Sequence, residues 1–190
     1  MRIRVSIATV GLLLLSRVAL AGGRGHLTPP PEELYYADAC ADHYQIPRAL
    51  VHAIITQESG WNPHALSNKN AMGLMQLMPD TVARYGVQDP WSSADNACGG
   101  AHYLADLIHQ FGDYREVIAA YYCGEHHIQA RGLQYANPAV TAYVLSVRNH
   151  YLHELAAEGF DVDESEHSHH SRKEGDSADT VNSAGSRYTR

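Results

Sequence analysis

Apolar residues recur at helical spacing through most of the chain, and this pattern is the strongest constraint on its fold. The clearest case begins at Pro47, a residue well suited to the first position of a helix, and leads to Glu58. Its apolar stripe consists of Leu50, Val51, Ile54 and Ile55. No segment shows a convincing alternation of apolar and polar residues, so the sequence predicts a mainly helical protein.

Five other segments carry helical signals. They are Pro31 to Tyr44, residues 79–86 with Gly86 at the end, residues 94–111, residues 116–122 and residues 138–155. A short hairpin near Ser67 to Ala71 is one option for the connections, and we place Glu125, His126 and His127 in a loop. The patterned part, residues 32–160, is long enough for one domain with a sizeable core.

The first 21 residues have the features of a signal peptide. Arg2 and Arg4 precede an almost unbroken apolar run from Val5 to Leu15, and Ala19-Leu20-Ala21 offers a small-residue cleavage site. We predict Sec export to the periplasm with cleavage after Ala21, so that the membrane is contacted only transiently. The alternative is an uncleaved anchor in the inner membrane. Residues 22–31, rich in Gly and Pro, are interpreted as a linker.

Residues 161–190 differ in composition from the preceding domain. They are dense in Ser, Asp, Glu, Gly and His and contain almost no apolar side chains, so we predict a disordered tail. His167, His169 and His170 could bind a metal, but a solvated tail is the favoured interpretation.

The charge balance is acidic. The chain has 14 Lys and Arg against 21 Asp and Glu, a formal net charge of -7, and loss of the signal peptide would remove Arg2, Arg4 and Arg17. Nucleic acid is therefore excluded as an expected partner, because binding to phosphates calls for basic patches. A neutral or mixed-charge polymer is compatible with this balance.

Glu58 is the strongest candidate for a catalytic residue. It lies one helical turn beyond Ile54, at the edge of the apolar stripe. Loss of water at such an edge disfavours the carboxylate and raises its pKa, which is the property that a general acid needs. The alternative interpretation is an ordinary solvated glutamate at a helix end.

The residues around Glu58 decide between these interpretations. Glu58-Ser59 is followed by Pro63-His64-Ala65-Leu66-Ser67, then Ala71, then Gly73-Leu74-Met75-Gln76-Leu77-Met78-Pro79. Further pieces follow in order: Asn96, Gly100, Tyr103 and Leu104, then Ala119-Ala120-Tyr121 and Gly124, then Tyr143-Val144. From Leu34 to Tyr151 the chain resembles the family 1 lytic transglycosylases (SLT domain), bacterial enzymes of the lysozyme superfamily that are related to goose-type lysozyme. The resemblance implies a compact lysozyme-like helical fold.

The same resemblance implies a reaction on peptidoglycan. One glutamate, here Glu58, protonates the oxygen that leaves C1 of N-acetylmuramic acid, and then acts as base while the 6-hydroxyl of that sugar attacks C1. The product is a 1,6-anhydro sugar, and neither a cofactor nor a metal is implied. Asp80, Asp89 and Asp95, the nearest acids that follow, lie in no recognisable catalytic motif, which favours this lytic route over hydrolysis. A muramidase that uses water remains the alternative.

Five residues match the family's substrate-binding positions. The resemblance implies that Ser67 helps to orient the acetamido group, and that Gln76 and Met78 line the saccharide groove. Tyr121 matches a tyrosine that bonds or packs beside the acid, and Tyr143 is a second candidate for a hydroxyl near Glu58.

Tyr122 and Cys123 depart from the family pattern, which has Asn and Ala at these positions. The change affects the expected shape of the groove but leaves Glu58, Ser67 and Gln76 untouched. It also motivates a third hypothesis, a factor that docks on the cell wall without cleaving it.

The resemblance also bears on the cysteines. An oxidising compartment allows at most one internal bridge among Cys40, Cys98 and Cys123, and relatives that tie their first helix to a later one favour Cys40 with Cys98. Three reduced, buried thiols are the alternative. The small size of the domain resembles specialised relatives that open the wall for conjugation, secretion or pilus machines, whose components are expected partners.

Overall fold

The computed structural model describes residues 28–134 and 137–160. Within these ranges the chain forms seven α-helices and one short 3-10 helix and no strand. They are α1 (Pro31–His43), α2 (Arg48–Glu58), α3 (Pro79–Tyr85), α4 (Ser93–Phe111), α5 (Tyr114–Cys123), α6 (Glu125–Arg131), η1 (Gly132–Gln134) and α7 (Pro138–Ala157). The predicted mainly helical class is therefore confirmed.

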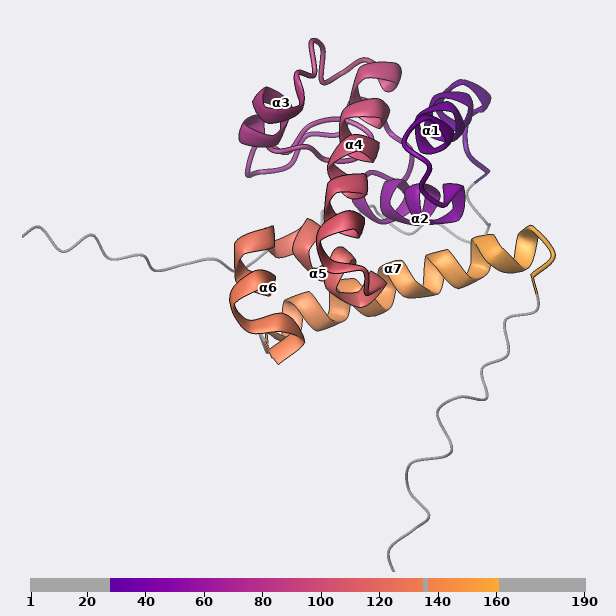
Figure 1. Ribbon diagram of the computed structural model, residues 1–190. Coiled ribbons are helices and arrows are strands. Elements are labelled where there is room, and N and C mark those ends of the chain that lie inside the picture. The colour runs from indigo at the N-terminus through magenta and orange to yellow at the C-terminus, as the bar shows by residue number, and fades with distance from the viewer. Residues whose placement is uncertain (1–27, 135–136, 161–190) are drawn as a thin grey trace, which may run out of the picture.

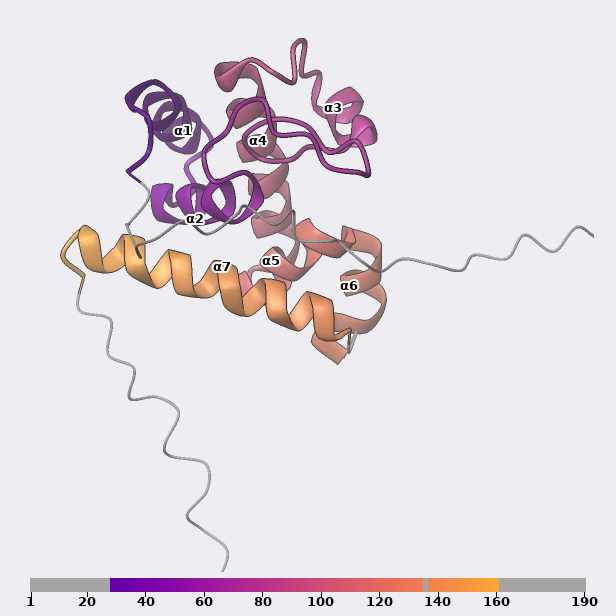
Figure 2. The ribbon, with the colours of Figure 1, turned by 180° about the vertical axis from the view of Figure 1, so that it is seen from behind.

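Helix α2 is buried along most of its length, since every residue from Ala49 to Ile55 is buried. In Figure 1, α4 crosses the middle of the molecule between α1 and α3, and α7 runs along the lower edge. Helix α2 packs against both α1 and α7, while α4 packs against α1 and α5. The view from behind shows the long connection between α2 and α3 lying in front of α4 (Figure 2). Glu58 is the last residue of α2, so it lies where this helix ends and the connection to α3 begins.

The apolar stripe of α2 is buried as the sequence predicted. Leu50, Ile54 and Ile55 are completely buried, and Ile54 and Ile55 lie about one helical turn before Glu58, the last residue of the helix. Each such side chain contributes about 1.5–3 kcal/mol on leaving water. This burial fixes the position of the C-terminal end of α2.

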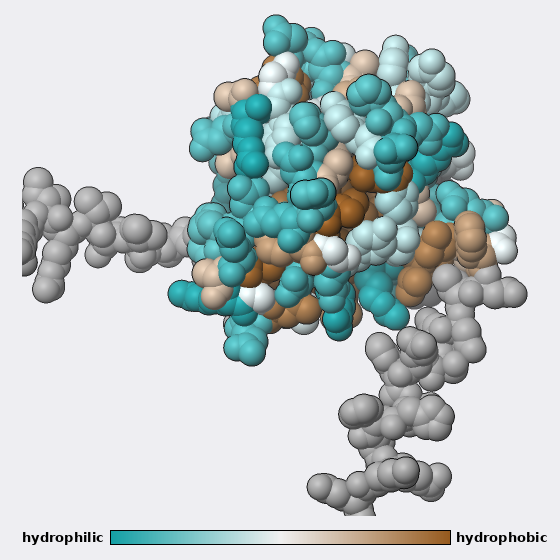
Figure 3. Space-filling view, in the orientation of Figure 1, coloured by the Kyte–Doolittle hydropathy of each residue, from teal (hydrophilic) through white to brown (hydrophobic). Residues whose placement is uncertain are grey.

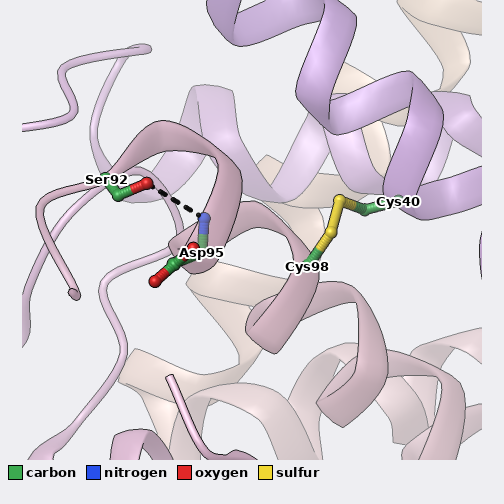
Figure 4. The surroundings of a disulfide bond; sticks show 4 residues. All are labelled: Cys40, Ser92, Asp95 and Cys98. Carbon is green, nitrogen blue, oxygen red and sulfur yellow. Dashed lines mark hydrogen bonds between the residues drawn. A yellow bond between two sulfur atoms is a disulfide. The ribbon is translucent and has the colours of Figure 1, made fainter. Parts of the chain in front are cut away.

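Local signals place several helix ends where the sequence indicated them. Pro31, Pro79 and Pro138 each occupy the first turn of a helix, where their missing N–H leaves no hydrogen bond unmade. The hydroxyl of Ser92 accepts a hydrogen bond from the N–H of Asp95 and caps α4 (Figure 4). Gly86 ends α3 in the left-handed conformation, with φ of 67°.

Two expectations about the connections need correction. The residues near Ser67 to Ala71 do not form a regular hairpin: only isolated antiparallel bridges join Leu66 to Met72 and Met72 to Leu77. Glu125, His126 and His127 do not lie in a loop, because they form the first turn of α6. The break at Gly124, with φ of 94°, ends α5 and lets a new helix begin, and the buried Ile128 holds that helix in place.

The side chain of Asn96 organises the connection between α2 and α3. Asn96 lies on α4 and is completely buried. Its carbonyl oxygen accepts from the N–H of Met75, and its amide donates to the carbonyl oxygens of Met72 and Pro90. A Cβ on Gly73 would lie 2.3 Å from the Asn96 amide nitrogen, so only glycine allows this close approach.

Hydrophilic side chains cover most of the face shown in Figure 3, with apolar atoms visible between them in places. Across residues 28–134 and 137–160, every helix is too short or too polar to cross a membrane. The expected signal peptide, most of the expected linker and the expected tail with His167, His169 and His170 lie outside the described residues.

A disulfide joins Cys40 on α1 to Cys98 on α4, the pairing favoured from the resemblance (Figure 4). The two Cα atoms are 4.9 Å apart, and the residues are separated by 58 positions in the sequence. Cys123 is free and partly buried.

We predict that replacing Cys40 and Cys98 together by Ser lowers the free energy of unfolding by about 3–4 kcal/mol, because the open loop regains conformational freedom in the unfolded chain. Urea unfolding under oxidising conditions measures this difference. Cys123→Ser is the matched control and should change the midpoint little. Equal unfolding midpoints for the double variant and the unaltered protein would contradict the prediction.

Candidate functional site

A cleft of about 530 Å³ opens beside the C-terminal end of α2. Its walls come from the connection between α2 and α3, from α3 itself, from α4 through Tyr103, and from the junction of α5 with α6. Glu58 lies in this wall together with Ser67, Gln76, Met78, Tyr121, Tyr122 and Cys123. The carboxyl group predicted to be catalytic therefore faces a space that a ligand can enter.

The pKa of Glu58 is raised from its ordinary value to about 7, mainly because burial disfavours the carboxylate. A hydrogen bond from the Tyr143 hydroxyl acts in the opposite direction, since it stabilises the charged form. At neutral pH the group is thus divided between its acid and carboxylate forms. A side chain in this state can both give and take a proton.

Tyr143 reaches Glu58 from α7, 85 residues further along the chain. Its hydroxyl donates to Glu58 Oε1, and its side chain is only 7% exposed. Burial and the neighbouring Glu58 charge raise the pKa of Tyr143 well above its usual value, so the phenol keeps its proton as a donor. The packing of α2 against α7 brings the two groups together.

The hydroxyl of Tyr121 bonds the backbone and not Glu58. The Tyr121 hydroxyl donates to the backbone carbonyl of Met75 at 2.8 Å and so ties α5 to the connection after α2. Its ring lies in the cleft wall next to that of Tyr103, with 5.2 Å between the ring centroids. Burial, and after it the charge of Glu58, raises the pKa of Tyr121 well above its usual value. Tyr121 thus lines the same cleft as the acid, but its hydroxyl is bonded to Met75.

Ser67 and Gln76 are tied into the backbone of the connection that they belong to. The Ser67 hydroxyl oxygen accepts from the N–H groups of Lys69 and Ala71. The Gln76 amide nitrogen donates to the carbonyl oxygens of Ala65 and Gly73, both at 2.9 Å. Because the hydroxyl oxygen of Ser67 serves as acceptor here, its proton remains available for a ligand.

Met78 and the two residues that depart from the family pattern complete the apolar part of the wall. Met78 is 43% exposed and offers its thioether to the cleft. The ring of Tyr122 stacks on that of Tyr143, with 4.4 Å between centroids and 23° between planes. Burial raises the pKa of the Cys123 thiol, which keeps it in the unreactive protonated form.

Several cleft residues were not predicted as site residues from the sequence. Arg84 on α3 donates to both carboxylate oxygens of Glu125 on α6, at 2.9 and 3.1 Å, so an ion pair joins these two walls. Tyr85 donates to Asp106 at 2.9 Å. The only sequence signal for them was the placement of Arg84 and Tyr85 at the end of a short helix, which says nothing about what that helix faces.

The carboxylates of the cleft wall are Glu58, Asp80 and Glu125. Asp80 belongs to the first turn of α3, and Glu125 is paired with Arg84. Asp89 and Asp95 are absent from the lining, and Asp95 accepts a hydrogen bond from the N–H of Asp89 at 3.0 Å. The described residues contain no group of three or more His, Cys, Asp or Glu arranged to hold a metal ion.

The sequence is similar to those of known transglycosylases. The chain is 36% identical over 86 residues to the "Transglycosylase" of Enterobacteria phage PRD1, which covers 45% of this chain and 32% of that protein. It is 36% identical over 88 residues to the "Soluble lytic murein transglycosylase" of Escherichia coli K12, covering 41% of this chain and 14% of that protein. The chain thus matches a third or less of the length of these relatives.

A solved structure shares the fold. The 70 kDa soluble lytic transglycosylase of Escherichia coli superposes with a TM-score of 0.59 at 24% identity, over 66% of this chain and 24% of that one. The family model described as "Transglycosylase SLT domain" matches residues 35–143, which is more than half of the 190 residues and includes both Glu58 and Tyr143. The chain therefore belongs to the Transglycosylase SLT domain family.

Proposed function

We propose that the protein cleaves the bond between N-acetylmuramic acid and N-acetylglucosamine in peptidoglycan without water and leaves 1,6-anhydro-muramic acid ends. The observation that carries this proposal is the position of Glu58, a half-protonated acid with a pKa of about 7 on the wall of an open cleft. Membership of the Transglycosylase SLT domain family supports it. So does the name of the Escherichia coli relative, a soluble lytic murein transglycosylase.

The reaction needs one proton donor that later becomes a proton acceptor. Protonated Glu58 gives its proton to the glycosidic oxygen as the bond from C1 to that oxygen breaks. The resulting carboxylate then takes the proton of the 6-hydroxyl while O6 bonds to C1, so Glu58 ends in its starting form. Tyr143 donates to the carboxylate at the stage when that group is charged.

The remaining cleft residues hold the sugar chain in this proposal. The Ser67 proton is directed to the acetamido group of the reacting sugar, and the Met78 thioether packs on an apolar sugar face. Gln76 acts mainly by fixing the wall, because its amide nitrogen bonds two backbone carbonyls. Tyr121 does the same from α5 through Met75.

The cellular role that we propose is local opening of the wall in the periplasm for a secretion or conjugation machine, after Sec export. This role rests on the likeness of the chain to small specialised family members. The phage PRD1 relative is itself named a transglycosylase, which is compatible with the same chemistry. A hydrolytic muramidase and a docking factor without activity are the competing functions, and the products of the reaction distinguish them.

We predict that residues 22–190 release muropeptides from purified peptidoglycan that are about 18 Da lighter than their reducing counterparts, since no water is added. Glu58→Gln should lower this release by at least about 10³-fold, because the amide cannot donate the proton. Mass spectrometry of the soluble products measures both effects. Glu116→Gln, a carboxylate on α5 outside the cleft lining, is the matched control and should retain activity.

Each other outcome of that experiment favours a competing function. Reducing products that depend on Glu58 would show hydrolysis, and Asp80→Asn would then test the remaining unpaired acid of the cleft wall. Absence of any product from the unaltered protein would favour a docking factor.

A second prediction concerns the pH dependence. Because the Tyr143 hydrogen bond lowers the Glu58 pKa, Tyr143→Phe should raise it above about 7. The general acid is active below its pKa, so the upper limb of the profile of kcat/KM against pH should move about one pH unit higher. Rates on solubilised glycan strands between pH 5 and 9, a range of about two units on each side of that pKa, measure this shift.

Ser146→Ala is the matched control for this prediction. It removes another hydroxyl of α7 that bonds a residue of α2, the side chain of Gln57, but not Glu58. The limb should stay in place for this variant. A limb that stays in place, or moves to lower pH, in Tyr143→Phe would show that the phenol does not stabilise the charged acid.

A further inference from the structure

The stacking of Tyr122 on Tyr143 links a cleft residue to the partner of the acid. Tyr122 lies near the end of α5, is half-buried and lines the cleft. Tyr143 comes from α7 and is almost completely buried. Their rings are nearly parallel, with 4.4 Å between centroids and 23° between planes. An aromatic contact thus joins α5 to α7 at the residue, Tyr143, whose hydroxyl bonds Glu58.

This contact restrains the orientation of the Tyr143 hydroxyl. The hydroxyl of a tyrosine lies on the long axis of its ring, so a tilt of the ring moves the oxygen relative to its partner. A parallel ring on one face limits that tilt. The hydrogen bond to Glu58 is directional and weakens when its donor moves off line. Removal of the Tyr122 ring therefore loosens the bond without touching either of its atoms.

We propose that Tyr122 is a positioning residue, which holds the Tyr143 hydroxyl on the Glu58 carboxyl by stacking and so tunes the acid through Tyr143. The inference concerns the site in the protein without substrate, and only its catalytic consequence rests on the proposed function. It assigns a role to a residue at which the chain departs from its family's signature. The phenolic oxygen of Tyr122 is not needed for this role, because the stacking surface is the ring.

Other titratable groups lie near Glu58 or line the cleft with it. The groups that respond to the Glu58 charge are the phenols of Tyr121 and Tyr122 on α5 and of Tyr143 on α7. The hydroxyl of Tyr121 is engaged with Met75. Lys69, Asp80, Arg84 and Glu125 line the same cleft. Exclusion of water by the Tyr122 ring would have the opposite effect, because added water lowers the pKa of Glu58.

The test is a titration of the Glu58 side-chain carboxyl by ¹³C NMR in the protein without substrate, with Glu58→Gln used to assign the signal. Tyr122→Ala should raise the Glu58 pKa by about half a pH unit, because the bond that favours the charged form is weakened. Tyr122→Phe, which keeps the ring, should leave it unchanged. Tyr122→Leu, which fills the space without stacking, should behave as Tyr122→Ala and replaces it if the alanine variant fails to fold.

A double variant distinguishes an effect of Tyr122 on the Glu58 pKa that passes through Tyr143 from a direct effect of Tyr122 on Glu58. In the Tyr143→Phe background the hydroxyl is already absent, so Tyr122→Ala should give no further rise in the Glu58 pKa. A fall of the pKa in Tyr122→Ala or Tyr122→Leu would mean that the ring acts by excluding water and would overturn the proposal. An unchanged pKa in those variants, or an equal rise in both backgrounds, would overturn it too.

The pH dependence of kcat/KM gives an independent measure of the Glu58 pKa in each variant. The upper limb of kcat/KM against pH should move with the Glu58 pKa in each variant, while a change in KM alone would indicate only contact with substrate. If the NMR titration gives the expected shifts and the protein cleaves no glycan, the positioning role stands and the proposed function fails. If cleavage is found without those shifts, the positioning role fails alone.

Discussion

The structure depends above all on the burial of α2 between α1 and α7. The completely buried Ile54 and Ile55 fix the end of this helix and thereby hold the carboxyl group of Glu58 at the edge of the core, beside the cleft. Its raised pKa is a consequence of that position. Helix α7 then adds a hydrogen bond from the Tyr143 hydroxyl, the one side-chain hydrogen bond of the acid among the residues that the structure describes. One packing arrangement thus supplies both the desolvation and the counteracting hydrogen bond.

The cleft wall formed by the connection between α2 and α3 is held by polar contacts in addition to the buried side chains of Leu74, Met75 and Leu77. Asn96 satisfies three backbone groups from within the core, and Gln76 satisfies two more from the connection itself. A segment without regular strands needs such partners, because buried N–H and C=O groups are costly when unpaired. The result is an irregular wall with a defined shape.

The sequence was sufficient for most of the fold, because apolar spacing and proline positions report helix faces and helix starts locally. It failed at α6, a seven-residue helix with one buried residue, Ile128, which leaves no periodic signal to detect. The resemblance gave Tyr121 as the first and Tyr143 as the second candidate for a tyrosine near Glu58, and in the structure it is the Tyr143 hydroxyl that bonds Glu58. Residues 85 positions apart meet only through the packing of α2 on α7, which no local pattern encodes.

Three successive features at the end of α5 connect parts of the site that are otherwise separate. Tyr121 bonds the connection after α2, Tyr122 stacks on α7, and the turn at Gly124 starts the helix whose Glu125 pairs with Arg84. Helix geometry fixes the spacing of these contacts to within one turn. The width of the cleft and the surroundings of the Glu58 carboxyl group therefore depend on the same short segment of the chain. Under the proposed function, a change in α5 that admits a bulkier glycan would also alter the surroundings of Glu58, so substrate range and acid strength would evolve together.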